Sequence, residues 1–482
     1  MTSVLSQVDP FGITYSAGPD AAPVLSKGLS RIPVKDRSGA VLGTLCGYVI
    51  AGYCGAGLHV TPDLIKADFD VPDAATFEAQ VLDGLHGAFV MFTHGALPHR
   101  LYPDCGGSIP IVFCAASKRL GSSAHMFLDP EEYEDRFNRP LHDSVVANDV
   151  SGSWITGTLT AHHGIERLLP NFYLDLERWE AVRFWPHVPD FALSAGLEDT
   201  ADLTAQALTG FLNAVAVEYR TGITMTAGFD SRILIAAARQ VRDKVEFFTI
   251  GSAGEGLDQD MTARISAEMG LSHRLTPIVQ SSAEEKAQWD YWVGHVVRES
   301  TRNVFPTLHP LSYDVILTGM YGETGRARLY RQDRETINTA PATAEFVLSR
   351  LTLPLVPEVV ENVEHWLAPI VDLPRSAVLD LAFNELRFGS WAMGQAPVQK
   401  AMQLAMMPFA QRSIQGAFMA MDPVEQGTEA LFNAIGARMW PEVMAYPVNK
   451  YGDYRDWTSK LTKVLHRDKL IRFTRDRFAA LK

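Results

Sequence analysis

Residues 223–232 combine the residue types and the spacing that most directly suggest chemistry in this chain. A short apolar run over 223–225 leads into small and polar residues, and an Ala-rich run that favours a helix follows over 233–239. This order predicts a strand, a tight loop and a helix N-terminus. Small residues let backbone N–H groups approach a ligand, and the helix dipole adds partial positive charge. The corner therefore suits an oligophosphate.

The loop of this corner differs from a Walker A loop because no Gly-Lys-Ser/Thr follows at the required spacing. It resembles the pyrophosphate loop of ATP pyrophosphatases, Ser-Gly-Gly-x-Asp-Ser. The residues at the motif positions here are Thr226, Ala227, Gly228, Asp230 and Ser231. The resemblance implies that they bind the phosphates of ATP. The alternative is an ordinary strand-to-helix corner capped by Asp230 and Ser231.

Length and composition indicate a globular protein with two domains or three, because 482 residues are too many for one ordinary core. The net charge of −13 argues against a nucleic-acid partner. No apolar run reaches the length of a membrane span and no signal peptide is visible, so we expect a cytoplasmic protein. The four cysteines include no CxxC pair, which favours free thiols over a zinc site.

The second half of the chain alternates strand-like and helix-like segments, which predicts a doubly wound parallel sheet. The expected strands and helix are, in chain order, 245–250, 258–269 (the helix), 271–278 and 313–318. Ligands of such sheets bind at the carboxyl ends of the strands. The loop at 226–231 lies at one such end, and residues 249–252 lie at another.

The order of these segments is similar to the synthetase domain of the asparagine synthetase family. That family has a Ser-Gly-x-Gly-x-Asp-Glu loop where this chain reads Thr318-Gly319-Met320-Tyr321-Gly322-Glu323. The alignment places Gly319 in the ATP site and Glu323 on the family's Asp. The resemblance implies ATP as cofactor, Mg²⁺ between Asp230 and Glu323, and adenine held by backbone groups of Thr249 and Ile250. The alternative for Glu323 is a solvated loop acid.

The first part of the chain predicts an α+β sandwich. Its expected strands are 41–50, 88–92 and 109–114, with a short helix at 77–85. Three segments resemble the N-terminal, Ntn-hydrolase-like domain of asparagine-synthetase-like proteins, namely 85–89, 102–110 and 165–171. Two prolines put a connector at 184–190. The resemblance therefore implies a glutaminase-like domain over 1–190 and, over 191–482, an ATP-pyrophosphatase-type synthetase domain with added helices.

The start of the chain departs from the glutamine-using members of this family, which begin Met-Cys-Gly-Ile and use the Cys as nucleophile. Position 2 here is Thr2, no Gly-Ile follows, and the family's Asn-Gly-Glu motif is missing. A Thr exposed by removal of Met is the alternative nucleophile. We interpret the first domain as a degenerate glutaminase-like domain with a structural role, which resembles β-lactam synthetases and lasso-peptide cyclases.

The group that would activate the amine is not fixed by the motifs. Residues 376–422 have a helical pattern, and their end resembles the family's Glu-x-Arg-Val-Pro-Phe-Leu-Asp segment, but Leu404 stands at the position of the Glu. Glu385 and Tyr321 are the candidates for this catalytic role. The alternative for Glu385 is a helix-surface acid paired with Arg387.

A lysine late in the chain completes the candidate residues. Lys450 lies in a loop bounded by Pro447 and Gly452. It resembles the family's catalytic lysine, which stabilises charge on the adenylate and on the following tetrahedral intermediate. The alternative is an ordinary exposed loop Lys.

The chemistry implied by the resemblance is carboxylate activation in specialised metabolism. A small-molecule or peptide carboxylate attacks the α-phosphorus of ATP, and an amine then attacks the acyl-adenylate to give an amide, a lactam or a macrolactam. Without a glutaminase nucleophile, the amine is free ammonia, a second substrate or a group of the same molecule. Two alternatives stay open, namely a pyrophosphate-loop enzyme that adenylates another acceptor and a non-catalytic ATP-binding protein. A homodimer is one hypothesis for the oligomeric state.

Overall fold

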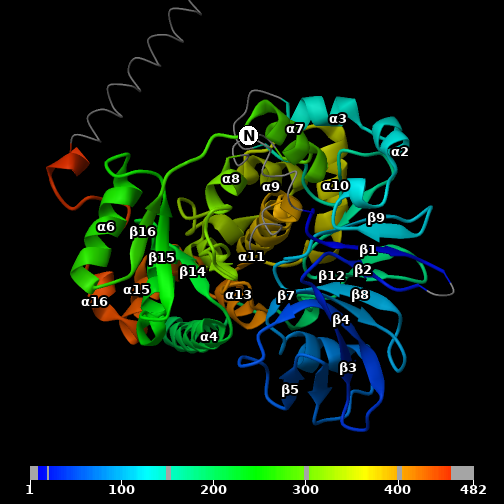
Figure 1. Cartoon of the computed structure of the whole chain (residues 1–482), viewed down its shortest axis with the longest axis horizontal. Helices are drawn as coiled ribbons and strands as arrows, with labels where there is room; N and C mark the ends of the chain where they lie inside the picture. Colours follow the sequence, from blue (N-terminus) through cyan, green and yellow to red (C-terminus); the bar gives the residue numbers. More distant parts are fainter. Residues whose placement is uncertain (1–8, 19–20, 148–152, 298–302, 399–403, 458–482) are drawn as a thin grey trace, which may run out of the picture.

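The computed structural model describes residues 9–18, 21–147, 153–297, 303–398 and 404–457. Thr2, the alternative nucleophile, lies outside these ranges. Within them, antiparallel sheets come first along the chain and a parallel sheet follows, with helices between and around them (Figure 1). The expectation of a mixed α/β protein in this order is confirmed. No helix of the described ranges is long and apolar enough to cross a membrane.

Two sheets in the first part of the chain share one buried core. The described strands of the smaller sheet lie in the order β11-β9-β10-β1-β2, and those of the larger sheet in the order β13-β12-β8-β7-β4-β3-β6-β5. Ile13 and Phe113 of the smaller sheet belong to the same buried cluster as Val90 and Leu101 of the larger one. The strands are β1 (Ile13–Ser16), β2 (Val24–Leu25), β3 (Ser30–Lys35), β4 (Val41–Val49), β5 (Leu58–Thr61), β6 (Leu64–Ala67), β7 (Gly87–Thr93), β8 (Arg100–Pro103), β9 (Ile111–Cys114), β10 (Arg119–Gly121), β11 (Glu166–Leu168), β12 (Phe172–Asp175) and β13 (Glu180–Arg183).

The helices of this part are short. The helix expected at 77–85 forms as α1 followed by η2, and the side chain of Asp73 caps its start by accepting from the amide of Thr76. The helices are α1 (Ala74–Thr76), η2 (Phe77–Leu82), η3 (Ala124–Met126), α2 (Pro130–Asp135), α3 (Arg139–Val145) and η4 (Val188–Asp190). All four cysteines are free, as expected.

The second part of the chain contains the predicted parallel sheet. Its described strands lie in the order β16-β15-β14-β17-β18, and every described neighbouring pair is parallel. The strands are β14 (Thr221–Thr224), β15 (Val245–Ile250), β16 (His273–Thr276), β17 (Val315–Leu317) and β18 (Leu404–Met406). The helical pattern expected over 376–422 is wrong at β18, because this short run finds a strand edge at β17 and pairs with it.

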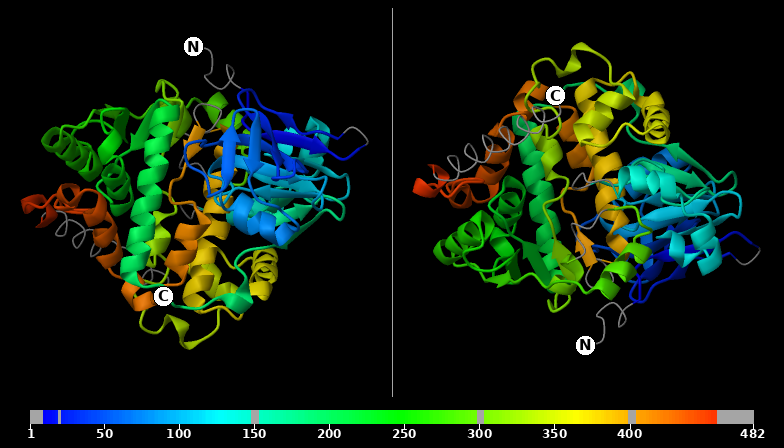
Figure 2. Two further views of the ribbon diagram at one scale, coloured as in Figure 1. Left: turned by 90° about the horizontal axis from the view of Figure 1, so that it is seen from below. Right: turned by 90° about the horizontal axis from the view of Figure 1, so that it is seen from above.

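Helices lie against the parallel sheet and between it and the antiparallel sheets (Figure 1, Figure 2). The long α4 packs against α5 and α15. The helices are α4 (Leu197–Glu218), α5 (Phe229–Ala237), η5 (Arg239–Val241), α6 (Leu257–Met269), α7 (Ala283–Trp292), α8 (Val304–Leu308), η7 (Gly322–Arg326), η8 (Ile337–Thr339), α9 (Ala344–Leu351), α10 (Pro357–Leu367), η9 (Ala368–Ile370), α11 (Arg375–Leu381), η10 (Ala382–Ala392), α13 (Arg412–Met419), α14 (Pro423–Gln426), α15 (Ala430–Met439) and α16 (Pro441–Met444).

A buried polar network joins the antiparallel part to the helices of the second part. The carboxylate of Glu385, in η10, accepts hydrogen bonds from Arg183, Asn171 and the indole of Trp366. The closest contact joins Arg183 Nη2 to Glu385 Oε2 at 2.6 Å, and the two side chains are 6% and 0% exposed. Arg412 extends the network by donating to Asn171. The network fixes η10 against β13.

We expect Glu385→Ala to lower the free energy of unfolding by about 3–5 kcal/mol, because it leaves the buried guanidinium of Arg183 without its counter-ion. Urea denaturation followed by circular dichroism measures this. The control is Glu361→Ala on the exposed face of α10, which should change the value by no more than about 0.5 kcal/mol. Equal stability of the two variants would contradict the structural role assigned to Glu385.

Candidate functional site

The pairing of β14 with β17 brings two loops together at one edge of the parallel sheet. Ile223 of β14 stands opposite Leu317 of β17, so both strands reach their carboxyl ends side by side. Gly319, two residues after β17, then lies directly against the first turn of α5, which follows the loop after β14. A Cβ at Gly319 would lie 2.7 Å from the Cβ of Asp230 and 2.9 Å from its carbonyl carbon. Because Gly319 has no side chain, the segment after β17 can contact the segment after β14.

The carboxylates of Asp230 and Glu323 lie near each other at this contact, close enough for their charges to interact. Asp230 Oδ1 and Glu323 Oε2 are both buried and have no hydrogen-bond partner in the described structure. Burial, with repulsion from Asp230 as the second cause, raises the pKa of Glu323 to about 7. Burial also raises the pKa of Asp230, although Arg326 acts in the opposite direction. Like charges held together in a desolvated place are typical of a site for a cation.

The carboxylate pair fits a magnesium ion that is shared with phosphates. No group of three or more His, Cys, Asp or Glu side chains suited to a metal occurs in the described ranges. Mg²⁺ on a nucleotide needs fewer protein ligands, because one or two carboxylates, phosphate oxygens and waters complete its coordination. The two unpartnered buried oxygens supply such a donor set. Arg326 currently neutralises part of this charge, with Nη2 donating to Asp230 Oδ2 at 2.5 Å.

The loop after β14 is held by hydrogen bonds to its own chain. The amide of Thr226 donates to Ser231 Oγ at 3.0 Å, and the amide of Gly228 donates to Thr226 Oγ1 at 3.2 Å. The amide of Ala227 donates to the carboxylate of Asp258, in the first turn of α6, at 2.8 Å. A bound phosphate would accept from backbone amides that now donate to side-chain oxygens. The most important of these amides is that of Ala227, which now donates to the Asp258 carboxylate.

A buried arginine places the segment before Lys450 next to the same loop. Arg232 is fully buried and donates to the carbonyl oxygens of Tyr446 and Pro447 at 2.6 and 3.2 Å. The amide of Asn449 donates to the carbonyl oxygen of Ala227 at 2.9 Å. A cavity of about 420 Å³ opens there, and its lining includes Lys450 and Arg326. The predicted lysine therefore lies beside the predicted phosphate loop, with an exposed side chain.

The residues predicted to hold adenine have partners of their own. The hydroxyl of Thr249 donates to the carbonyl oxygen of Met225 at 2.8 Å, which ties the end of β15 to the segment after β14. The carbonyl oxygen of Ile250 accepts from Gln259 Nε2 at 2.7 Å. Thr249 thus supports the phosphate loop from behind. Adenine contact with the Ile250 carbonyl stays a prediction, and it would compete with Gln259.

Tyr321 and Glu385, the candidates for amine activation, are both enclosed by the protein. The hydroxyl of Tyr321 is buried and donates to the carbonyl oxygen of Gly106 at 2.8 Å, and burial raises its pKa well above the usual value. The carboxylate of Glu385 is used by the buried polar network, and Arg183 rather than Arg387 is its ionic partner. Neither position supports a role in amine activation, which stays an untested prediction for both.

Three charged residues of the site were not indicated by the sequence motifs. Arg326 follows Glu323 by three residues in the same loop, Asp258 starts α6, and Arg387 lies two residues after Glu385. Arg326 was detectable in principle, because i, i+3 spacing in a helical turn places a cation near the carboxylates. Asp258 and Arg387 reach the site only through the tertiary fold, and no local pattern marks them.

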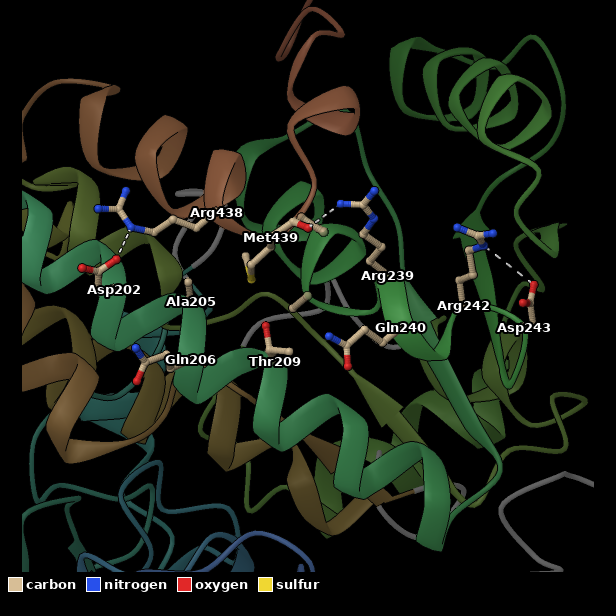
Figure 3. Close-up of a pocket in the computed structure, with 12 residues that line it drawn as sticks. Asp202, Ala205, Gln206, Thr209, Arg239, Gln240, Arg242, Asp243, Arg438 and Met439 are labelled. Carbon is tan, nitrogen blue, oxygen red and sulfur yellow. Dashed lines mark hydrogen bonds and ion pairs between the residues drawn. The ribbon is translucent and has the colours of Figure 1, made fainter.

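Figure 3 shows the residues that line a larger cavity, of about 940 Å³. It is lined by α4, the C-terminal end of α5 with η5, and the end of α15, whereas the carboxylates lie at the N-terminal end of α5. Its arginines are engaged by the chain itself. Arg438 pairs with Asp202 and Glu198, and Arg239 donates to the carbonyl oxygen of Met439. Size alone therefore does not make it the functional site.

Comparison with known proteins adds no family to this picture. No protein-family model matches the chain, and no curated protein matches it either. The chemistry of the site is therefore inferred from its own residues.

We expect Glu323→Gln to stabilise the protein by about 1–3 kcal/mol at pH 8 and to change little at pH 5. Because the pKa of Glu323 is raised in the folded protein, the folded state keeps the Glu323 proton over a pH range in which the unfolded chain has lost it. Stability is therefore lost as pH rises towards about 7, and Gln removes this loss. Thermal unfolding at both pH values measures the effect.

The matched control for Glu323→Gln is Glu335→Gln, an exposed acid a short distance along the chain. It should leave the midpoint of unfolding unchanged at pH 5 and pH 8. If Glu323→Gln were neutral or destabilising at pH 8, the two carboxylates would not be a repelling pair in the folded protein.

Proposed function

We propose that the protein is an ATP-dependent, AMP- and pyrophosphate-forming carbon–nitrogen ligase that adenylates a substrate carboxylate and joins it to an amine. In this proposal the parallel sheet is an ATP-pyrophosphatase-type domain. The antiparallel part is an Ntn-hydrolase-like domain of the asparagine-synthetase-like superfamily, without a working glutaminase site. The boundary between them falls near residue 190.

One observation carries this proposal. Asp230, in the first turn of α5, and Glu323, in η7, follow two adjacent parallel strands, and each has a buried oxygen without a hydrogen-bond partner among the described residues. The N-terminus of α5 favours negative charge. Two carboxylates beside a helix N-terminus suit a phosphate chain together with its cation. A structural ion pair or an ordinary helix cap would require only one of the two carboxylates.

Each residue has a distinct task in this reaction. Asp230 and Glu323 would hold Mg²⁺, which when bound neutralises charge on the phosphates. The amides of the Thr226–Ser231 loop bind the pyrophosphate portion of ATP. Arg326, freed from Asp230, and Lys450 donate to oxygens that gain negative charge as the carboxylate oxygen bonds to the α-phosphorus and pyrophosphate leaves. The same cations stabilise the tetrahedral intermediate formed when the amine attacks.

The source of the amine follows from what the chain lacks. The family's Asn-Gly-Glu motif is missing from the sequence, so we do not propose glutamine as the source of ammonia. Leu404 stands where the resemblance puts the amine-handling Glu, and β18, to which it belongs, is an edge strand of the sheet. We therefore place the amine on a second substrate, on free ammonia, or on the carboxylate substrate itself.

A non-catalytic nucleotide binder is the second candidate, and one observation favours it. Asp258 already occupies the amide of Ala227, and Arg326 already occupies Asp230. A protein that keeps its phosphate loop filled in this way could bind a nucleotide weakly without turning it over. Turnover separates the two candidates.

We expect wild-type protein to form AMP and pyrophosphate from Mg-ATP when offered a small-molecule extract of its host organism. Asp230→Ala should abolish this, because it removes one of the two carboxylates that hold the metal. Coupled detection of pyrophosphate and chromatographic detection of AMP measure the reaction. Formation of ADP and phosphate instead, or equal rates for both proteins, would contradict adenylation. Bound Mg-ATP without any turnover would favour the non-catalytic candidate.

We expect Lys450→Ala to lower the rate of pyrophosphate formation about 10²–10³-fold while the dissociation constant of Mg-ATP changes only a few-fold, because the ammonium acts on charge that develops in the transition state. Lys244→Ala, an exposed lysine before β15, is the control and should keep full activity. A large loss of ATP affinity with an unchanged rate would assign Lys450 to ground-state binding.

A further inference from the structure

A third cavity, of about 720 Å³, is lined in part by Arg326, the ion-pair partner of Asp230. It lies between the segment after η7, the end of α9 and one side of η10. Five arginines and one acid line it together with apolar and aromatic side chains. The charged residues are Arg326, Arg328, Arg331, Arg350, Arg387 and Asp333. A volume of this size accommodates an organic ligand.

The arginines of this cavity outnumber the acids that neutralise them. Three have an acidic partner within 4 Å, namely Arg326 with Asp230, Arg331 with Glu429 and Arg350 with Asp333. Arg328 and Arg387 have none among the described residues. The chain as a whole carries a net charge of −13, so this concentration of positive charge is local. It implies a ligand with negative charge.

Arg387 is held by aromatic rings, and its guanidinium donates no hydrogen bond to any residue that the structure describes. Its guanidinium carbon lies 5.2 Å from the ring centroids of Trp154 and Trp391 and 5.6 Å from that of Phe383. Such contacts hold a guanidinium by cation–π attraction. Its planar N–H groups stay available for a carboxylate or phosphate, which they match in geometry.

The cavity reaches the site of the proposed chemistry through Arg326. This side chain lines both this cavity and the smaller one that contains Lys450, and it donates to Asp230. Arg387 is also near enough to Glu323 for their charges to interact. A carboxylate that enters along this cavity therefore arrives beside the residues assigned to the phosphates of ATP.

We infer that this cavity binds the carboxylate substrate, and that the substrate is an organic acid with a second anionic group on an apolar body. The inference rests on the proposed function. Arg328 and Arg387 have no acidic partner among the described residues, and one of them receives the carboxylate that reacts while the other receives the second anion. Phe383, Trp391 and Leu329 contact the apolar body.

Binding of defined diacids tests this inference without any nucleotide. The probes are glutarate, adipate, suberate and phenylsuccinate, each compared with its monomethyl ester by isothermal titration calorimetry. At least one diacid should bind about tenfold or more tightly than its ester, because the ester loses one charge-assisted contact. If no diacid is preferred over its ester, the inference is wrong.

Two variants test whether the arginines of this cavity cause the preference for a diacid over its ester. A third variant controls for the loss of one positive charge. Arg387→Gln should remove most of the diacid-over-ester ratio. Arg328→Gln, an exposed position that tolerates substitution, should reduce it even if Arg387→Gln fails to fold. Arg37→Gln, an exposed arginine of the first domain, should leave the ratio unchanged. An unchanged ratio in Arg328→Gln and in folded Arg387→Gln would place the diacid elsewhere and overturn the inference.

The outcomes separate this inference from the proposed function. Diacid preference without pyrophosphate formation in the extract would leave the cavity as an anion site and would count against the ligase. Pyrophosphate formation without diacid preference would keep the ligase and would overturn the assignment of a dianionic substrate.

Discussion

The parallel pairing of β14 with β17 is the constraint on which the site depends. It sets Gly319 against Asp230 so closely that a single methyl group at position 319 would collide with the first turn of α5. The same contact brings Glu323 near Asp230, and both carboxyl groups are withdrawn from water. Burial raises the pKa of both groups, and repulsion from Asp230 is the second cause of the raised pKa of Glu323. The fold tolerates the free-energy cost of burying two carboxylates because the strands, and not the loops, fix the positions of Asp230 and Glu323.

The rest of the chain supports this edge of the sheet while leaving it able to receive a ligand. Arg232 ties the segment before Lys450 to the loop from below, and Thr249 ties the next strand to it from the side. Asp258 and Arg326 satisfy the loop amide and the carboxylate through contacts within the chain. Both are charged groups that a magnesium-bound phosphate can replace with like chemistry, since the phosphate supplies the anion and the metal supplies the cation. The buried polar network at Glu385 in turn holds η10, which carries Arg387 to the neighbouring cavity.

Much of the framework was predictable from the sequence, and the reasons are local. The strands at 245–250 and 313–318 show apolar runs bounded by turn residues, and the loop at 226–231 shows its strand, break and helix in order. β18 was missed because a three-residue edge strand has no periodicity of its own and depends on β17 for its hydrogen bonds. The burial of Glu385 and Tyr321 was missed because their partners, Arg183 and Gly106, lie more than 200 residues away along the chain. Charge-bearing residues such as Arg387 acquire a role only from neighbours that the tertiary fold supplies.

A structure with Mg²⁺ and the non-hydrolysable analogue α,β-methylene-ATP tests the central claim most directly. We predict a metal ion in contact with Asp230 and Glu323, phosphate oxygens on the amides of the loop after β14, and Arg326 moved from Asp230 to a phosphate. A nucleotide bound at any other place, or bound at the loop while the Asp230–Arg326 pair stays closed and no metal joins the two carboxylates, would contradict it.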